Sequence, residues 1–411
     1  MVYEFGEFTL DTNRQQLSRG DQPTHLEPQV YAVLCHLLEH RDRLVTSREM
    51  MEHVWGDRFV TPGTLNSRIK ALRQALGDDG ATQRMIKTVH GRGFRMHVEV
   101  RAVADTPRAS APGPSSRDPA PARQQIFFCR AQDGVRIAYA KSGDPGAPPL
   151  VKPANWLTHL EVDWNSPVWR HWLTEMGRGH TLIRYDERGC GLSDHDAPEL
   201  SFESWVRDME AVVDAAGLER FSLLGISQGC AVAIAYAVRH PERVDKLVLY
   251  GGYAVGRSYR IKTPQEELER TLLSNLIRVG WGRDNPAFRQ VFGMLFLPEG
   301  TPEQHQWFND LAKTMPMENA LRVRQTTDVI DVRAEAAAVR APTLVLHARG
   351  DAMIPFETGR QLAALIPGAR FVPLESRNHV LLETEPAWSR FLEEVRAFLD
   401  SRERYPSGVH A

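Results

Sequence analysis

The sequence of 411 residues has few cysteines, no long apolar run and no clear excess of either charge. Its cysteines are Cys35, Cys129, Cys190 and Cys230. They show no CxxC spacing, so we expect neither a zinc site nor a disulfide framework. No stretch approaches the roughly 18 consecutive apolar residues of a membrane-spanning helix, and the opening MVYEFGEFTL lacks the basic and apolar segments of a signal peptide. These absences predict a cytoplasmic protein without metal, cofactor or membrane contact.

The balance of charge excludes a uniformly basic nucleic-acid coat protein. Lysine and arginine total 50 and aspartate and glutamate 52, which gives a net charge of -2. Apolar residues make up 42% and charged residues 25%, ordinary values for a globular protein, so disorder along the whole chain is excluded as well. At roughly 100–200 residues per domain, the length predicts two or three domains. A local basic surface remains open.

One segment differs in composition from its surroundings. Residues 101–125 contain five prolines, six alanines and no aromatic residue. Such a stretch cannot bury apolar area, and we expect a semi-extended tether. It separates an N-terminal domain, residues 1–100, from a C-terminal domain, residues 126–411.

The N-terminal domain combines short strands with helices. In chain order, the pattern predicts strands over 2–10 and 16–19, helices over 28–40, 47–55 and 64–76, and a hairpin of 86–89 and 94–98. Ser47 is the expected N-cap of the second helix. The hairpin turn contains Gly91 and Gly93, which can adopt the positive φ that tight turns need.

Basic residues concentrate in the second half of this domain. Residues 1–57 hold five Lys/Arg against ten Asp/Glu, whereas residues 58–95 hold eight against two. A basic helix alone is most often a solvated surface. A basic helix followed by a basic hairpin is more specific, because a helix can read the major groove of DNA and a hairpin can reach the minor groove.

The N-terminal domain resembles the winged-helix effector domain of OmpR/PhoB-type bacterial regulators. The matching segments are LVTSREMMEHVWG, TLNSRIKALRQALGDDG and IKTVHGRGFRM. The resemblance implies that the helix over 64–76 enters the major groove of double-stranded DNA and that the hairpin is the wing. Carried over, the candidate DNA contacts are Asn66, Ser67 and Lys70 for bases or phosphates, Arg68 and Arg73 for phosphates, and Arg92 at the wing tip. No receiver domain accompanies this module in the sequence.

The C-terminal domain alternates apolar strand-like runs with longer helical segments, which is typical of an α/β sheet. The strands are expected in IFFCRA, VRIAYAKSG, PPLVKPA, TLIRYD, FSLLGI, KLVLYG, PTLVLHAR and ARFVPLE. A mostly helical insertion without a comparable strand lies between the sixth and seventh of these, over about 255–340. The sequence therefore predicts an α/β domain with a helical lid.

Three residues of this domain form a nucleophile pattern. Ser227 lies in Gly225-Ile226-Ser227-Gln228-Gly229, directly after a strand and before a helix, where a sharp turn exposes the serine. Asp351 closes the strand PTLVLHAR, and His379 lies in the loop after the last strand. We expect His379 to accept the proton of Ser227 while Asp351 orients the imidazole. His347 competes for this role but is expected to be a packed residue within a strand.

The order Ser-Asp-His resembles that of the α/β-hydrolases, and the resemblance covers residues 126–400. The segment DERGCGLSD matches the family's turn after the fourth strand, and we interpret this turn as structural. The segments WLTHLE and RNHVLLE are most similar to those of hydrolase domains fused to bacterial regulatory modules. The resemblance implies an oxyanion hole formed by the backbone N–H groups of Gln228 and Trp156. The sequence Lys152-Pro153-Ala154-Asn155-Trp156 departs here from the family's usual His-Gly, so we expect slow turnover.

Two functions fit this combination. The first is a DNA-binding transcription regulator whose hydrolase-fold domain binds, and can hydrolyse, a small-molecule effector. The second is an esterase-like serine hydrolase with accessory DNA binding. Aromatic residues of the lid favour a moderately apolar ligand, although the same residues can simply pack the lid: Tyr259, Trp281, Phe288, Phe292, Phe296, Trp307 and Phe308. The sequence leaves a homodimer open, and it identifies neither the ligand nor the operator.

Overall fold

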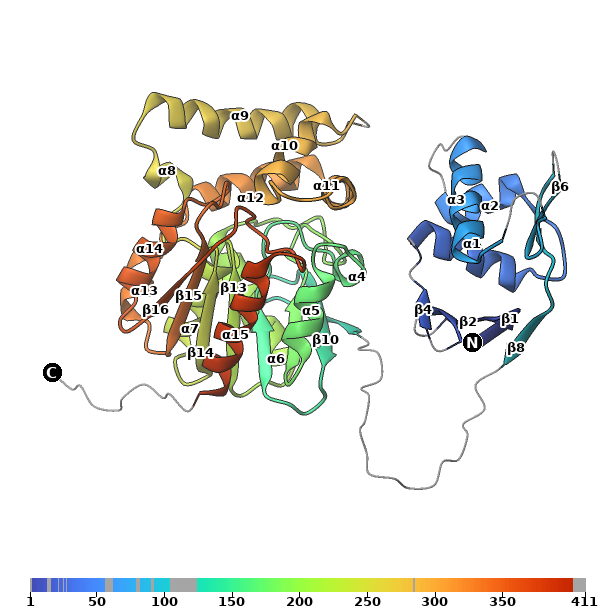
Figure 1. Cartoon of the computed structure of the whole chain (residues 1–411). Helices are drawn as coiled ribbons and strands as arrows, with labels where there is room; N and C mark the ends of the chain where they lie inside the picture. Colours follow the sequence, from blue (N-terminus) through green and yellow to red (C-terminus); the bar gives the residue numbers. More distant parts are fainter. Residues whose placement is uncertain are drawn as a thin grey trace, which may run out of the picture. The chain divides into compact units, whose positions relative to one another are not determined.

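The computed structural model divides into two compact units, Met1–Arg117 and Asp118–Ala411 (Figure 1). It describes residues 2–12, 16–20, 22–24, 26, 28–55, 62–78, 82–89, 92–103, 124–283 and 285–401. Most of the predicted tether, residues 104–123, lies outside these ranges.

An antiparallel sheet opens the first unit, with the strand order β4-β3-β2-β1-β8. Its strands are β1 (Val2–Phe5), β2 (Phe8–Asp11), β3 (Gln16–Arg19), β4 (Gln22–Thr24) and β8 (Val100–Val103). The single strand expected over 2–10 is therefore wrong, because the chain reverses at Gly6, whose φ is +56°, and pairs Phe5 with Phe8. Residues 101–103 also leave the predicted tether, because β8 pairs with β1 at the edge of this sheet.

Three helices of the first unit pack beside a second sheet. The elements are α1 (Pro28–Glu39), α2 (Ser47–Trp55), α3 (Pro62–Ala75), β5 (Val45–Thr46), β6 (Ile86–Val89) and β7 (Gly93–Met96), with the strand order β5-β7-β6. Leu34 of α1 and Leu72 of α3 are fully buried in the shared core, as the helical spacing predicts. The N-cap is Thr46 and not Ser47, since the Thr46 hydroxyl accepts the Glu49 N–H at 3.1 Å.

The second unit is built on an eight-stranded sheet with the order β16-β15-β14-β13-β11-β12-β10-β9. Its strands are β9 (Gln125–Arg130), β10 (Arg136–Gly143), β11 (Pro149–Lys152), β12 (Thr181–Tyr185), β13 (Phe221–Ile226), β14 (Val244–Tyr250), β15 (Thr343–Ala348) and β16 (Arg370–Leu374). Each lies within one residue or two of a predicted run. The pairs from β12 through β16 are parallel, so the carboxyl ends of these strands meet at one edge of the sheet.

Helices cover the sheet on both faces (Figure 1). They are α4 (Leu160–Trp164), α5 (Arg170–Gly177), α6 (Phe202–Ala215), α7 (Gly229–Arg239), α13 (Arg333–Ala338), α14 (Phe356–Leu365) and α15 (Pro386–Asp400). Trp172 of α5 packs against Trp388 and Phe391 of α15 with ring centroids 4.8 and 4.7 Å apart. This aromatic cluster joins two helices that are far apart in the chain.

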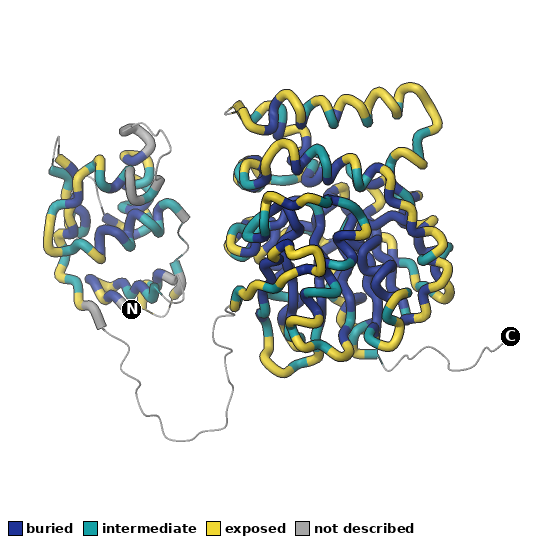
Figure 2. The backbone as a smooth tube through the Cα atoms, turned by 180° about the vertical axis from the view of Figure 1, so that it is seen from behind, coloured by how far each residue is buried: buried dark blue, intermediate teal, exposed yellow. Residues whose placement is uncertain are grey.

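The helical insertion lies over the carboxyl ends of the strands (Figure 1). Its helices are α8 (Arg257–Arg260), α9 (Pro264–Gly280), α10 (Ala287–Phe296), α11 (Pro302–Ala312) and α12 (Met317–Asp328). An antiparallel bridge between Val255 and Asp331 closes the base of this insertion. The predicted range of 255–340 also included α13, but α13 packs with α7 and α14 of the main body. The central strands of this unit are buried, whereas the edge strand β9 and much of α9 are exposed (Figure 2).

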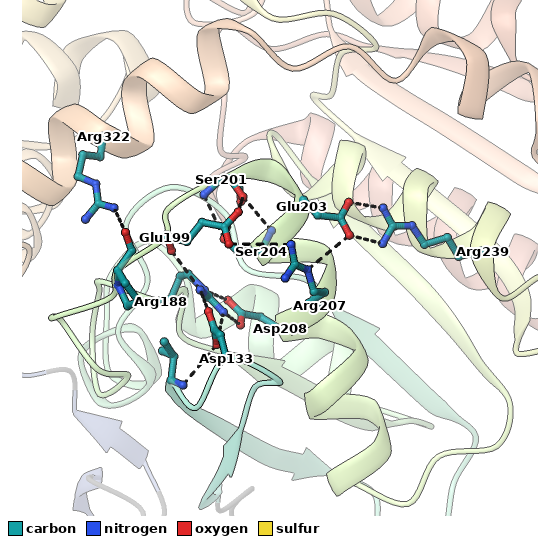
Figure 3. Close-up of polar contacts among 12 residues, drawn as sticks. Asp133, Arg188, Glu199, Ser201, Glu203, Ser204, Arg207, Asp208, Arg239 and Arg322 are labelled. Carbon is teal, nitrogen blue, oxygen red and sulfur yellow. Dashed lines mark hydrogen bonds and ion pairs between the residues drawn. The ribbon is translucent and has the colours of Figure 1, made fainter.

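The turn after β12 has a structural role, as interpreted from the sequence. The buried Arg188 guanidinium donates to both carboxylate oxygens of Asp208, at 2.7 and 2.6 Å, and to Asp133 at 2.6 Å (Figure 3). Nearby, Arg322 of α12 donates to the carbonyl oxygens of Ala197 and Pro198. These contacts fix the turn and join the lid to the main body.

Within the described ranges, none of the helices has the length and apolar character that crossing a bilayer requires.

Candidate active site and DNA-binding surface

Ser227 occupies a sharp turn between β13 and α7. Its φ is +53°, a left-handed conformation that non-glycine residues seldom adopt. The turn is tight because its glycines lack side chains: a Cβ at Gly225 would lie 2.7 Å from the Cys230 Cα, and one at Gly229 would lie 2.9 Å from the Ala154 carbonyl oxygen. The turn therefore needs both glycines, and it places Ser227 at the amino end of α7.

His379 and Asp351 form a buried hydrogen-bonded pair beside this turn. The His379 Nδ1–H donates to Asp351 Oδ2 at 2.7 Å. The other oxygen of Asp351 accepts the N–H groups of Met353 and Ile354 at 2.9 and 2.8 Å, which fixes the carboxylate. The His379 N–H donates to the Phe296 carbonyl oxygen at 2.8 Å, so the lid helix α10 also holds this loop. The imidazole is thus set in one tautomer and orientation.

His379 and Ser227 line the same cavity. The His379 Nε2 is buried and makes no hydrogen bond to any described residue. This apolar-walled space has about 410 Å³, counting space open to solvent. This arrangement leaves Nε2 available to take a proton inside the cavity.

His347, the alternative histidine, is a packed strand residue as expected. It is fully buried in β15, and its Nε2 hydrogen-bonds the Ile354 carbonyl oxygen at 2.9 Å. Burial lowers the pKa of His347. Its ring lies so close to Gly359 that a Cβ there would be 2.1 Å from Nδ1.

Two cavities meet at Ser227, and both include Trp156 and Phe296 in their walls. The apolar cavity is the one that contains His379, and it is also lined by Trp169, Phe308 and Leu311. The arginine cavity has about 550 Å³ of space, counting space open to solvent, and its wall includes Gln228, Arg257, Arg260, Arg324 and Asp328. Ser227 thus lies at the junction of an apolar space and a charged one.

The two expected oxyanion donors lie at this junction. Among the described residues, neither the Trp156 nor the Gln228 backbone N–H donates to another backbone group. Below them, the buried Lys152 ammonium donates to Asn155 Oδ1 at 2.5 Å, and the Asn155 amide donates to the Trp156 carbonyl oxygen at 3.4 Å. Burial lowers the pKa of Lys152 to about 8. Lys152 and Asn155 therefore orient the Trp156 segment where the sequence lacks the usual His-Gly.

A buried carboxyl group supports the other donor. The Gln228 amide donates to Glu187 Oε1 at 2.6 Å, and the second oxygen of Glu187 has no hydrogen-bond partner among the described residues. Burial raises the pKa of Glu187 to about 8, so this side chain is neutral at pH 7. A neutral acid here places no negative charge beside the expected oxyanion hole.

The lid aromatics have more than one role. Trp281, Phe292, Phe296 and Phe308 surround the Trp156 ring with centroids between 5.4 and 6.4 Å away. Phe296 and Phe308 also line the apolar cavity, whereas Tyr259 is 55% exposed. The lid thus packs itself and covers the Ser227 site with the same side chains. The lid arginines of the second cavity gave no signal in the sequence, because only the folded chain brings them together.

The predicted DNA contacts differ in their exposure. Asn66, Ser67 and Lys70 are exposed on neighbouring positions of α3, and the Arg68 Nε–H donates to Gln29 at 2.9 Å. Arg73 is turned into its own domain, where it donates to the Ile86 carbonyl oxygen at 2.7 Å and to the Thr88 hydroxyl at 2.8 Å. Its predicted phosphate contact stays a prediction, and these internal contacts compete with it.

Basic residues extend the exposed surface onto the hairpin. Arg92 is exposed at the start of the wing's second strand, and Lys87 and Arg95 are exposed as cross-strand partners on β6 and β7. The turn residues His90 and Gly91 lie outside the described residues. The hairpin thus presents positive charge, as a phosphate-binding surface requires.

One cluster of the first unit has atoms close enough for a metal. The ligand atoms of His36, His40 and Glu49 lie within 4.8 Å of one another. Arg43, however, donates to both oxygens of Glu49 at 2.8 and 2.5 Å, and this pair holds the pKa of Glu49 at about 2. The carboxylate already has a cationic partner, so the cluster is accounted for as an ion pair.

Two family models match the chain. The model described as alpha/beta hydrolase fold matches residues 157–386, more than half of the chain. The model described as transcriptional regulatory protein, C terminal, matches residues 21–96. The predicted combination of a winged helix and an α/β-hydrolase fold is confirmed by these two matches.

Curated relatives and solved structures match the second unit. AB hydrolase superfamily protein YisY of Bacillus subtilis is 30% identical over 204 residues, which span 49% of this chain and 75% of that protein. Pyrrolizixenacetamide deacetylase of Xenorhabdus hominickii is 27% identical over 61% of this chain and 92% of its own length. An esterase from Exiguobacterium antarcticum superposes with a TM-score of 0.55 at 24% identity, covering 67% of this chain and all of that one, which shows a shared fold.

Proposed function

We propose that this protein is a transcription regulator with an effector-hydrolysing domain. The chain belongs to the α/β-hydrolase fold family, and it also carries a winged helix of the regulator type. The winged helix binds double-stranded DNA, and the hydrolase-fold unit binds a small molecule at Ser227. Hydrolysis of that molecule would end the signal that it carries. The proposal rests above all on the hydrogen-bonded pair of His379 and Asp351. His379 lines a cavity together with Ser227, and its Nε2 has no hydrogen-bond partner among the described residues.

The geometry supports acyl transfer through a covalent intermediate. The Ser227 hydroxyl attacks a carbonyl carbon while His379 Nε2 takes its proton, and Asp351 stabilises the resulting imidazolium. The backbone N–H groups of Gln228 and Trp156 receive the negative oxygen. His379 then protonates the leaving group, and water releases the acyl group by the reverse sequence. A relative named as a deacetylase is consistent with this reaction class.

The DNA-binding part of the proposal rests on exposed charge and on the matching family model. Asn66, Ser67 and Lys70 lie together on the outer face of α3, the helix that corresponds to the groove-reading helix in the resemblance. A pocket ligand that signals must change DNA affinity by roughly 5–150-fold, the usual range of coupling between two sites. We propose that a homodimer carries this coupling, because a proline-rich tether is a poor rigid lever.

The test combines a fluorophosphonate probe with a DNA mobility shift. We expect the probe to label Ser227 of the full chain, and we expect labelling to change the affinity for operator DNA selected from random sequence. A labelled protein whose DNA affinity is unchanged would contradict the sensor function and would leave a hydrolase with accessory DNA binding. That second function is favoured by one observation, the complete Ser-Asp-His arrangement. Absence of labelling in a folded chain would contradict both.

A further inference from the structure

Three arginines converge on the cavity beside Ser227. Arg257 and Arg260 come from the short helix α8, and Arg324 comes from α12, so two separate elements of the lid supply them. All three line the arginine cavity, together with a single carboxylate, Asp328. Arg257 also lies 3.5 Å from Glu269, so the excess of positive charge in this wall rests on Arg260 and Arg324.

Arg324 is the most buried of the three arginines, and only some of its donor groups have a partner. It is 8% exposed, and its Nε and one terminal nitrogen make no hydrogen bond to any described residue. That terminal nitrogen lies 3.6 Å from Asp328, but Asp328 also faces Arg270 at 3.4 Å. Asp328 is thus shared between two guanidinium groups, of which Arg270 has a second carboxylate partner in Glu267. A buried charged group without its hydrogen bonds is costly, so its unused donors indicate a ligand.

Arg260 shows the same pattern more weakly. Its Nε is buried without a hydrogen bond to any described residue, and its side chain donates to the Thr358 hydroxyl at 3.4 Å. The guanidinium lies 5.6 Å from the centroid of the Tyr253 ring. Burial lowers the pKa of both Arg260 and Arg324, which means that their charged forms lack sufficient partners in the folded chain.

We propose that the arginine cavity binds a carboxylate on the acyl part of the molecule that Ser227 attacks. Guanidinium groups bind carboxylates through paired hydrogen bonds, and they do so most strongly where water is excluded. The ligand of this domain is then an ester or amide of a dicarboxylic acid, which adds a charged group to the moderately apolar ligand expected from the lid aromatics. This inference rests on the proposed function of the Ser227 site.

The positions of His379 and Gln228 assign the two halves of the ligand. His379 lines the apolar cavity and must protonate the leaving group, so the leaving alcohol or amine lies there. Gln228 lines the arginine cavity, where the acyl part extends. Ser227 Oγ bonds to the acyl carbon, the bond to the leaving group breaks, and water then cleaves the acyl-enzyme. The products are a dicarboxylic acid and an alcohol or amine.

The test compares two esters that differ in one terminal group. Mono-p-nitrophenyl glutarate carries a carboxylate where p-nitrophenyl pentanoate carries a methyl group, and both release the same chromophore. We expect the full chain to favour the glutarate ester in kcat/KM by about 10–100-fold, the range for hydrogen bonds to a charged group. In Arg324→Gln that preference should fall by a similar factor while pentanoate hydrolysis changes less than about threefold.

Two controls separate a binding role from a structural one. Arg278→Gln removes an exposed lid arginine that does not line the cavity and should keep the preference. Arg324→Lys retains the positive charge and should recover part of the preference for the glutarate ester. Arg260→Gln should lower the preference as well, which keeps the test open if Arg324→Gln fails to fold. Equal loss on both esters in the folded Arg324→Gln and Arg260→Gln chains would overturn the proposal.

Calorimetric titration with glutarate separates this inference from the hydrolytic function. If the wild-type chain cleaves neither ester and resists the fluorophosphonate probe, the hydrolytic function fails. The carboxylate site still stands in that case if glutarate binds to the wild-type chain and loses at least about tenfold in affinity in Arg324→Gln. Absence of glutarate binding to the wild-type chain overturns the carboxylate site, whatever the outcome with the probe.

Discussion

The two units of this chain hold their candidate functional residues in opposite ways. In the second unit, His379 and Asp351 are buried and every hydrogen bond of Asp351 can be named. In the first unit, Asn66 and Lys70 are exposed. The contrast follows from the chemistry: proton transfer needs groups fixed to within a fraction of an ångström, whereas binding to phosphates needs accessible charge. Substitutions in the second unit therefore test the geometry of the catalytic groups proposed there. Substitutions in the first unit test the charge of the surface proposed to bind DNA.

The largest effect should come from the loss of the proposed nucleophile. We expect Ser227→Ala to lower ester hydrolysis by several orders of magnitude and to abolish fluorophosphonate labelling, because no covalent intermediate can form. DNA affinity without ligand should not change. Active-site labelling followed by peptide mass spectrometry checks this. Labelling at another serine in the variant would show that the wrong nucleophile was assigned.

The next effect concerns the residue that orients the histidine. Asp351→Asn should lower kcat by about 10³–10⁴-fold, because an amide cannot hold His379 in the tautomer that accepts a proton at Nε2. His347 lies 3.6 Å from the same Asp351 oxygen, so His347→Gln serves as the matched control and should cost far less activity. The measurement is the pre-steady-state burst with p-nitrophenyl esters. Comparable losses in the two variants would mean that His347 takes part in the proton path.

The sequence allowed the framework of the second unit to be predicted because its strands are nearly continuous apolar runs. β14 and β15 are buried along almost their whole length, and such runs are hard to mistake between turn signals. The nucleophile turn was equally predictable, since its glycines are required by contacts of less than 3 Å. The end of the lid was not, because the Val255–Asp331 bridge joins residues distant in sequence.

The remaining misses also depend on tertiary contacts. The capping role passed from Ser47 to Thr46, a shift of one residue that spacing alone does not resolve. β8 lies in a segment with a tether-like composition and is ordered by pairing with β1. Arg324 and Arg260 gave no pattern, because they lie on different helices and meet only at the cavity. The sequence therefore indicated the reacting groups but not what surrounds the ligand.

A smaller effect should appear in the pH dependence of stability, which is expected to differ between a buried and an exposed carboxyl group. Glu187 keeps its proton in the folded chain up to a pKa of about 8, whereas its ordinary value is 4.5. Between these values the folded state binds more protons than the unfolded state, so the free energy of unfolding falls as pH rises. Glu187→Gln mimics the protonated acid and removes this dependence.

The stability of Glu187→Gln relative to wild type should therefore grow between pH 5 and pH 8, by on the order of 1–3 kcal/mol. Urea unfolding followed by tryptophan fluorescence at several pH values measures this difference. Glu375, which is exposed on the same unit, supplies the control variant Glu375→Gln, whose difference from wild type should stay constant. A constant difference for Glu187→Gln as well would show that Glu187 is ionised at neutral pH.

The smallest effect is expected in the first unit. It tests whether the candidate DNA contacts of this unit are exposed rather than held in place by internal hydrogen bonds. Lys70→Gln should weaken DNA binding about 3–10-fold at physiological salt and lower the salt slope by about 0.9, because one phosphate contact is lost. Arg73→Gln should instead lower the unfolding temperature by a few degrees at unchanged slope, since Arg73 donates to Ile86 and Thr88 within the domain. Arg19, an exposed residue paired with Glu7 on the other sheet, provides the control Arg19→Gln, which should alter neither quantity much. If Arg73→Gln lowers the salt slope as Lys70→Gln does, Arg73 leaves its internal partners to bind DNA. The first unit would then hold one of its functional residues in place before binding, as the second unit does.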